Sequence, residues 1–131
     1  MSILFCGIWY YYDMDIWKHG TYIDTWSLVH FLSGVLLSSL FYKLGFGFTL
    51  ALVCSFFILL AWEVFEWAIT IIEPSANVIM DMVFGTLGFL LGFFLLVNMG
   101  VSFWILFCPT ALTAFVLSFW GFFDFLSKGY R

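Results

Sequence analysis

Charged residues are scarce in this sequence of 131 residues, because Asp, Glu, Lys and Arg together make up only 9% of it. A water-soluble domain carries roughly 25% of such residues, and hydrophobic residues reach 65% here. This composition excludes a soluble surface and predicts a protein whose partner is the lipid bilayer. Lys and Arg number four against eight Asp and Glu, so no basic face is available for nucleic acid.

Cysteine and proline are also rare. The three cysteines, Cys6, Cys54 and Cys108, are an odd set without metal-type spacing, so we expect neither a disulfide framework nor a cysteine metal site. Pro74 interrupts the apolar sequence between two long segments and predicts a helix boundary there. Pro109 lies inside the last apolar segment, where a membrane helix tolerates proline.

Apolar segments of membrane-spanning length fill most of the chain. A helix that crosses about 30 Å of hydrocarbon needs roughly 20 residues. Four segments satisfy this length, and we expect spans at 26–44, 46–72, 76–97 and 102–126. Residues 1–25 contain Trp and Tyr that suit the headgroup boundary and predict an interfacial segment. The sequence thus predicts an all-α, integral membrane four-helix bundle that forms one domain over residues 1–131.

The few basic residues indicate an orientation in the membrane. Four spans place both termini on one side, which carries Lys18, Lys128 and Arg131, whereas the other side carries Lys43. Because cytoplasmic loops hold the excess of Lys and Arg, we expect both termini in the cytoplasm.

Four ionisable side chains fall at a similar depth in the predicted bundle. His30 and Asp81 lie near the start of the first and third spans, and Glu63 and Glu66 lie near the end of the second. These three ends share one side of the membrane. At 1.5 Å per residue, the four groups occupy a band roughly 6 to 13 Å beneath the terminus-bearing face. Asn77 shares the helical face of Asp81, and these five residues form the candidate polar cluster.

Small residues follow the same helical faces. At 100° per residue, the polar stripes of the first and third spans also contain Gly34, Ser38, Gly85, Gly88 and Gly92. Small residues let membrane helices approach each other closely, so we assign these five to helix packing. Asp81 is therefore expected to face the interior of the bundle.

The cluster has no basic residue to balance it. No Lys or Arg occurs between Lys43 and Lys128, which leaves His30 as the only cationic candidate beside three carboxylates. A carboxylate at mid-membrane costs on the order of 3 kcal/mol, so these groups must be buried and partnered. The site must hold protons, admit water or bind a cation, unless a closed hydrogen-bonded network serves only to orient the helices.

A divalent metal ion is the cofactor that fits the cation interpretation. Its ligands are then His30, Glu63, Glu66 and Asp81, and Asp24, which begins the His30 helix, is a weaker candidate or a helix cap. Imidazole and carboxylate suit Mn, Fe or Zn and, with more oxygens, Mg or Ca. Two-metal carboxylate bundles usually carry Glu-x-x-His, whereas this chain offers Glu-x-x-Glu.

Three motifs carry a resemblance to a known family. They are Tyr22-Ile23-Asp24 leading to His30-Phe31-Leu32-Ser33-Gly34, then Glu63-Val64-Phe65-Glu66-Trp67, and then Asp81-Met82 followed by Gly85 and Gly88. In these motifs the chain resembles the YjdF-type bacterial inner-membrane proteins and, more distantly, the VanZ-like superfamily. The spacing from aspartate to histidine is longer here, and the stretch before the Asp-Met pair is shorter. The resemblance implies a bacterial inner membrane and a functional polar constellation, but neither a catalytic activity nor a substrate.

Two functions of different classes fit this sequence. In the first, the buried carboxylates bind a cation or handle the headgroup of an amphiphile, and His30 is a ligand or a proton shuttle. In the second, the chain is an accessory subunit that packs against other membrane protein subunits, and its polar cluster is purely structural. The sequence leaves open whether the protein is an enzyme.

Overall fold

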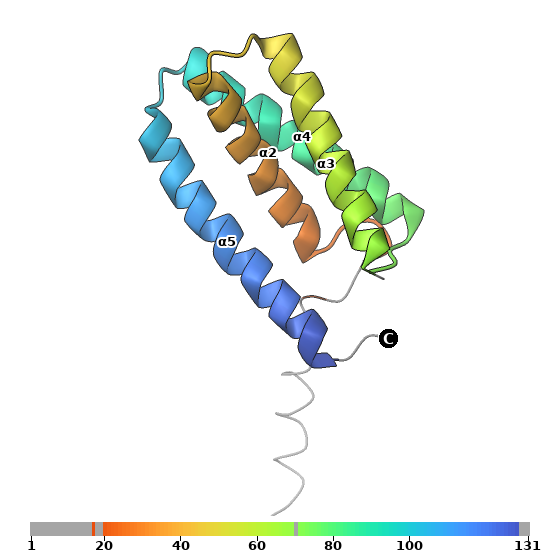
Figure 1. Cartoon of the computed structure of the whole chain (residues 1–131). Coiled ribbons are helices and arrows are strands. Elements are labelled where there is room, and N and C mark those ends of the chain that lie inside the picture. The colour runs from red at the N-terminus through yellow and green to blue at the C-terminus, as the bar shows by residue number, and fades with distance from the viewer. Residues whose placement is uncertain (1–16, 18–19, 70, 129–131) are drawn as a thin grey trace, which may run out of the picture.

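A computed structural model describes Trp17, residues 20–69 and residues 71–128, and this part of the chain contains four helices (Figure 1). They are α2 (Thr25–Lys43), α3 (Phe48–Ala68), α4 (Ser75–Val97) and α5 (Phe103–Lys128). All four are long and apolar enough to cross a membrane, and the described residues include no strand. The predicted all-α four-helix fold is therefore confirmed. Most of the interfacial segment predicted for residues 1–25 lies outside the described residues.

Local sequence explains where the helices begin and end. The Asp24 carboxylate accepts hydrogen bonds from the backbone N–H groups of Trp26 and Ser27, and the Ser27 hydroxyl accepts one from the Asp24 N–H. This capping box starts α2. Gly45 and Gly100 adopt φ angles of 78° and 65° in the turns that follow α2 and α4, where glycine carries no steric penalty.

The second helix is shorter than the apolar segment that predicts it. We expected a span over residues 46–72, whereas α3 begins at Phe48 and ends at Ala68. Gly47 has an extended backbone before α3, and Pro74 has one before α4. The apolar residues after α3 therefore belong to a connection, which the backbone N–H of Ile71 closes onto the carbonyl of Glu66.

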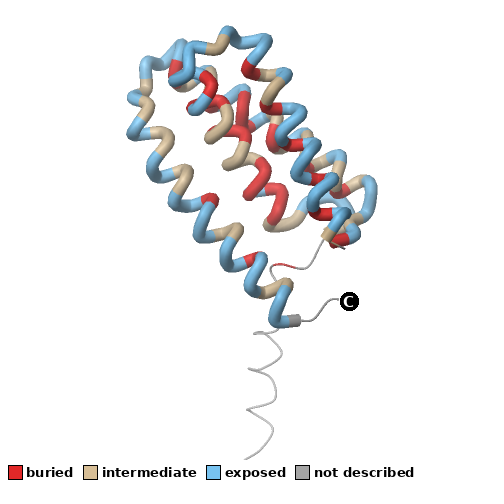
Figure 2. Tube along the Cα trace, in the orientation of Figure 1, coloured by how far each residue is buried: buried red, intermediate tan, exposed pale blue. Residues whose placement is uncertain are grey.

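The central helix of the bundle is α2. It packs against α3, α4 and α5, whereas α3 packs against α2 and α4 (Figure 1). Burial agrees with the central place of α2. Half of the residues in the α2 span are buried, but only 11% of those in the α5 span (Figure 2). At one end α5 meets α2 through aromatic rings, where Trp17 lies 5.0 Å from Trp26 and 5.9 Å from Trp120 between ring centroids.

Small residues form the seam between α2 and α4. A Cβ atom on Gly34 would overlap the Gly85 carbonyl and lie 2.7 Å from the backbone nitrogen of Phe89. A Cβ atom on Gly88 would overlap the carbonyl of Phe31 in the same way. The seam continues where Gly92 faces Ser38, whose hydroxyl donates to the Val35 carbonyl at 2.8 Å. All five residues assigned to helix packing thus lie at the α2/α4 contact.

The outer faces of the bundle are apolar. Large hydrophobic side chains are exposed along α3, α4 and α5, and on α5 they include Trp104, Phe115 and Phe119 (Figure 2). Such a surface is unfavourable in water and matches the hydrocarbon of a bilayer. The chain is therefore a small integral membrane protein.

Candidate functional site

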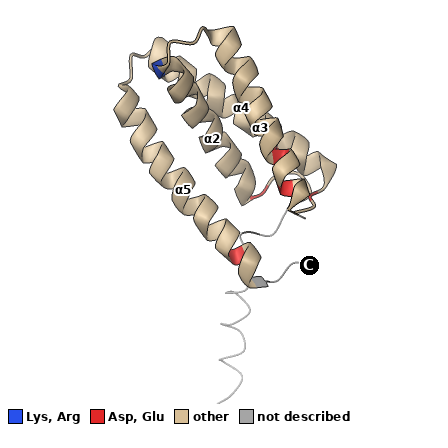
Figure 3. Cartoon of the chain, viewed as in Figure 1, with Lys and Arg blue, Asp and Glu red and all other residues tan. Residues whose placement is uncertain are grey.

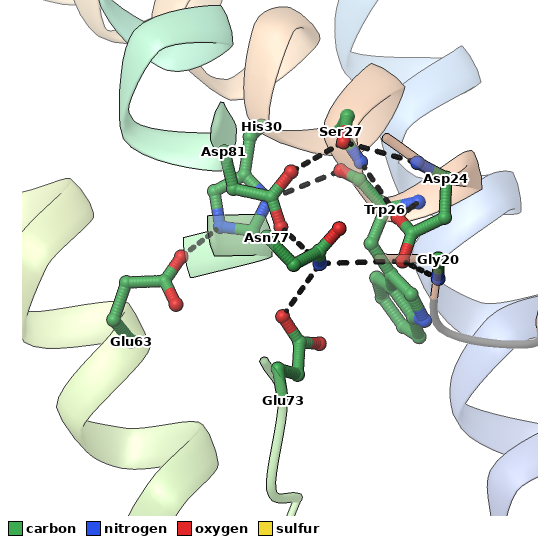
Figure 4. A network of polar contacts seen from close by, with 9 residues as sticks. All are labelled: Gly20, Asp24, Trp26, Ser27, His30, Glu63, Glu73, Asn77 and Asp81. Atoms are coloured by element: carbon green, nitrogen blue, oxygen red, sulfur yellow. Dashed lines mark hydrogen bonds and ion pairs between the residues drawn. The ribbon is translucent and has the colours of Figure 1, made fainter. Parts of the chain in front are cut away.

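His30 is the central side chain of the polar cluster, and α2 fixes its orientation. Its Nδ1 lies 3.0 Å from the carbonyl oxygen of Trp26, one turn earlier in the helix (Figure 4). A carbonyl oxygen only accepts hydrogen bonds, so Nδ1 must carry a proton and donate it. The other ring nitrogen, Nε2, faces α3 and lies 2.8 Å from Oε1 of Glu63. Both side chains are buried.

Asp81 enters the cluster from α4 and is held through both of its oxygens. Oδ1 accepts a hydrogen bond from the Ser27 hydroxyl at 2.5 Å, and Oδ2 accepts one from the Asn77 amide at 3.2 Å. Oδ2 also lies 3.8 Å from Nδ1 of His30. Asp81 is fully buried, as its place on the small-residue face of α4 requires.

His30, Glu63 and Asp81 form one compact group. Each offers a ligand atom, and the three atoms lie within 4.8 Å of one another. The predicted buried group of histidine, glutamate and aspartate is thus confirmed, and it joins three different helices. Figure 4 shows the imidazole of His30 between the two carboxylates.

Several polar atoms in the cluster have no hydrogen-bond partner among the described residues. They include Nε2 of His30, Oε1 of Glu63, Oε2 of Glu66 and Oδ1 of Asn77. Nε2 and Oε1 lie 2.8 Å apart, which qualifies as an ion pair by distance, and a hydrogen bond between them needs a proton on one of the two atoms because Nδ1 carries the other ring proton. A buried polar atom without a partner costs roughly 1 to 3 kcal/mol. The cluster therefore has unused capacity for a proton or a cation.

Asn77 links the compact group to the start of α2. Its amide nitrogen lies within hydrogen-bond distance of three carboxylates: Glu73 at 2.9 Å, Asp81 at 3.2 Å and Asp24 at 3.3 Å. Asp24 also accepts a hydrogen bond from the Gly20 N–H at 3.0 Å. Asp24, the weaker metal candidate, is thus the cap of α2 and lies outside the compact group.

Glu66 is buried but does not belong to the compact group. Three residues along a helix turn the side chain by about 300°, which leaves Glu66 about 60° from the direction of Glu63. It remains close enough to His30 and Glu63 for electrostatic interaction. Glu66 instead borders a cavity with Trp26 and Trp62, on the side of α3 that faces α5.

Glu73 is the residue of this network that the sequence interpretation missed. Its carboxylate accepts a hydrogen bond from the Asn77 amide at 2.9 Å. Asn77 and Asp81 are four residues apart on one face of α4, whereas Glu73 precedes the helix, so spacing along a helix does not predict its contact.

The basic side chain that the structure describes lies far from the cluster. Lys43, at the opposite end of α2, is the one Lys or Arg side chain that the structure describes, and its Nζ lies 5.6 Å from the ring centroid of Phe103 (Figure 3). The acidic side chains instead gather toward the other end of the bundle. Within the described residues, His30 therefore has no basic neighbour that could neutralise the carboxylates.

Comparisons with protein-family models, with curated proteins and with solved structures find no match for this chain. The resemblance to YjdF-type and VanZ-like proteins remains a prediction. The fold and the burial of the cluster define the class of the molecule by themselves. It is a small integral membrane protein that contains a buried group of histidine, glutamate and aspartate.

Proposed function

We propose that this membrane protein binds a divalent cation inside its helix bundle, with His30, Glu63 and Asp81 as ligands. One observation carries the proposal. Nδ1 of His30 is committed to the Trp26 carbonyl, which directs the lone pair of Nε2 toward Glu63. Metal-binding histidines usually donate their other N–H to a carbonyl or carboxylate, because this fixes the tautomer and the ring.

The distances in the compact group suit a metal ion after small side-chain movements. Two ligands at about 2.1 Å from a tetrahedral ion are about 3.4 Å apart. Nε2 and Oε1 are 2.8 Å apart, and the whole group lies within 4.8 Å. Glu63 must rotate to open the first distance, and any pair of ligand atoms farther apart than about 4.2 Å must close, because each lies about 2.1 Å from the ion. The carboxylate of Asp81 is already held by Ser27 and Asn77.

Charge is compatible with a divalent ion as the occupant. Two carboxylates with a neutral imidazole balance a charge of +2, and Lys43, the one basic side chain that the structure describes, lies at the other end of α2. Histidine nitrogen together with carboxylate oxygen suits Zn²⁺, Mn²⁺ or Fe²⁺. Glu66, which is buried one turn away, is available as a further oxygen ligand for an ion of higher coordination number.

Metal analysis of purified protein tests this function. After chelation and titration with Zn²⁺, Mn²⁺ or Fe²⁺ in detergent, we expect about one tightly bound ion per chain and a higher unfolding temperature. Glu63→Gln keeps the side-chain size but removes a ligand charge, and it should lose the ion. Asp124→Asn, on α5 and outside the compact group, is the matched control and should keep it. Equal binding by both variants contradicts the proposal.

A structural role in a larger assembly is the second candidate. The weakly buried α5 favours it, because this helix presents most of its aromatic surface outward. In that case the cluster only orients α2, α3 and α4, and the exposed side of α5 contacts another membrane subunit. Purification in mild detergent separates the candidates, since a monodisperse protein free of partners counts against the accessory subunit.

A further inference from the structure

A hydrogen-bonded network leads from the end of the bundle to the compact group. Its outer members are Asp24, at the start of α2, and Glu73, in the connection between α3 and α4, and both are half-buried. Its inner members, Asn77 and Asp81 of α4, are fully buried. We call these four residues the Asn77 network. Because Asp81 also belongs to the compact group, with Oδ2 at 3.8 Å from Nδ1 of His30, the network joins the outside of the bundle to the proposed cation ligands.

The amide of Asn77 lies between the two half-buried acids and the buried one. Its nitrogen is 2.9 Å from Glu73, 3.3 Å from Asp24 and 3.2 Å from Asp81 (Figure 4). A primary amide has two N–H donors, so it cannot satisfy three carboxylates at once. Its carbonyl oxygen, Oδ1, is buried without a partner among the described residues. The network is therefore one donor short and has one unused acceptor, and a cation between the acids would meet both needs.

We propose that Asp24, Glu73 and Asn77 form the entrance through which a divalent cation reaches the compact group. This inference rests on the proposed cation site. Asp24 and Glu73 attract the ion first, because neighbouring carboxylates raise the local concentration of cations. The Asn77 amide can turn by half a rotation about its last side-chain bond, which brings Oδ1 to the carboxylates in place of the N–H groups. The ion then meets oxygen atoms all the way from the outer acids to Asp81.

A second approach to the compact group, between α3 and α5, does not suit an ion. His30 also lines a cavity of about 630 Å³ on this side. The described residues of its wall include no acid, and two of them, Ile58 and Phe115, are exposed on the outer face that hydrocarbon surrounds. A cation on this route would lose its hydration water without a carboxylate to replace it. The Asn77 network offers such groups at each step, so it is the route that a charge can follow.

The rate of Zn²⁺ uptake tests the entrance. Zn²⁺ is the probe, since nitrogen and oxygen ligands bind it more tightly than Mn²⁺ or Fe²⁺. The metal-free protein, as the whole chain in detergent, is mixed with Zn²⁺ in a stopped-flow instrument, and a zinc-sensitive dye reports the free ion. Glu73→Gln keeps an acceptor for the Asn77 amide but removes a charge. Uptake should slow by about tenfold, the low end of what a cleft of one charge sign adds to an association rate. The final occupancy should not change, because Glu73 is not a proposed ligand.

Asp124→Asn supplies the matched control. Asp124 is another half-buried acid toward the same end of the bundle, but none of the hydrogen bonds of Asn77 reaches it (Figure 3). This variant should keep the native rate. Higher ionic strength should slow the native protein more than Glu73→Gln, since salt screens the attraction of the entrance, whereas a purely structural role of Glu73 would leave the salt dependence unchanged. Equal rates in the two variants overturn the proposal.

The role of Asn77 is tested by replacing its amide with an apolar group of similar size. Asn77→Leu should slow both uptake and chelator-driven release of Zn²⁺ by about tenfold, which is the rate effect of one lost polar contact to a charged group. Weaker binding with a native uptake rate would mean that Asn77 only holds Asp81 in place, and this result refutes its part in the entrance. If Asn77→Leu does not fold, the comparison of Glu73→Gln with Asp124→Asn decides the proposal.

The same measurement separates the two routes and the two proposals. Ala111→Trp places a large side chain in the cavity between α3 and α5 and should leave the uptake rate unchanged. Slow uptake in this variant, together with a native rate in Glu73→Gln, would assign entry to the cavity and overturn the entrance. If the native protein binds no Zn²⁺, the cation site fails and the entrance falls with it. If Zn²⁺ binds but Glu73→Gln takes it up at the native rate, only the entrance is refuted.

Discussion

Asp24 stabilises two parts of the structure with one carboxylate. It caps α2 through the backbone N–H groups of Trp26 and Ser27, and it accepts a hydrogen bond from Asn77 of α4. We expect Asp24→Ala to lower the free energy of unfolding by about 1 to 2 kcal/mol, as removal of a helix cap usually does. Asp24→Asn keeps an acceptor for the cap and should lose less. Thermal unfolding of the purified variants measures both, and equal losses would contradict the capping role.

Asp81 and Asp124 differ in burial although both lie near helix ends. Asp81→Leu leaves the Ser27 hydroxyl and the Asn77 amide with one acceptor fewer, and a buried donor without a partner costs about 1 to 3 kcal/mol. Asp124→Leu changes a half-exposed position on α5 and should cost much less. Denaturant titration in detergent, together with metal content, compares the two. Similar tolerance of both substitutions would show that Asp81 is not an interior group.

The seam between α2 and α4 is the contact most sensitive to a single added methyl group. A Cβ atom at Gly88 meets the backbone of Phe31, which cannot rotate away, so Gly88→Ala must push the two helices apart. Such overpacking costs about 1 to 3 kcal/mol. Gly47→Ala is the control, because nothing lies within 4 Å of that added atom. Unfolding midpoints should fall for Gly88→Ala alone, and a fall of equal size in both variants would refute the close seam.

The helices were predictable from the sequence because their apolar length is a local property. Their ends were less so, as α3 shows, since its apolar segment runs on past Ala68, whereas the backbone leaves the helical conformation at Ile69, with φ of −92° and ψ of 15°. The compact group was predictable in part, because depth follows from position along each helix. Depth brought Glu63 and Glu66 together, but they point about 60° apart around α3, and the rotation of α3 about its axis decides which of them faces His30. That rotation depends on packing between helices, which one sequence pattern does not specify.

The hydrogen bonds of Asn77 were also predictable only in part from the sequence. Its hydrogen bond to Asp81 follows from their spacing on α4, whereas its bond to Glu73 reaches back to the connection before that helix. Its contact with Asp24 joins residues 53 positions apart. That contact forms only because α2 and α4 approach closely along the glycine seam, so it could not be read from local spacing.

The orientation of the whole bundle remains a prediction that reporter fusions can test. The sequence predicts that both termini, with Lys18, Lys128 and Arg131, lie on one side of the membrane and Lys43 on the other. In a bacterial inner membrane, we therefore expect a fluorescent protein fused to the C-terminus to mature and alkaline phosphatase fused there to stay inactive. The opposite result would place the polar cluster near the outer face. A fusion in the turn at Gly45 is the complementary control and should reverse both readouts.

The uneven attachment of the four helices has a mechanical consequence. Glycine contacts lock α4 onto α2, whereas α5 rests on α2 with little of its surface buried and forms one wall of a groove between α3 and α5, whose lining includes His30. Spanning helices respond to a change of bilayer thickness by tilting, and we expect α5, which has the smallest buried share, to tilt most. Thinner or thicker membranes should therefore alter the width of the groove through α5, while the geometry around His30 stays fixed. Lateral stress in the lipid would in this way change the groove beside the group of His30, Glu63 and Asp81 without moving these three side chains.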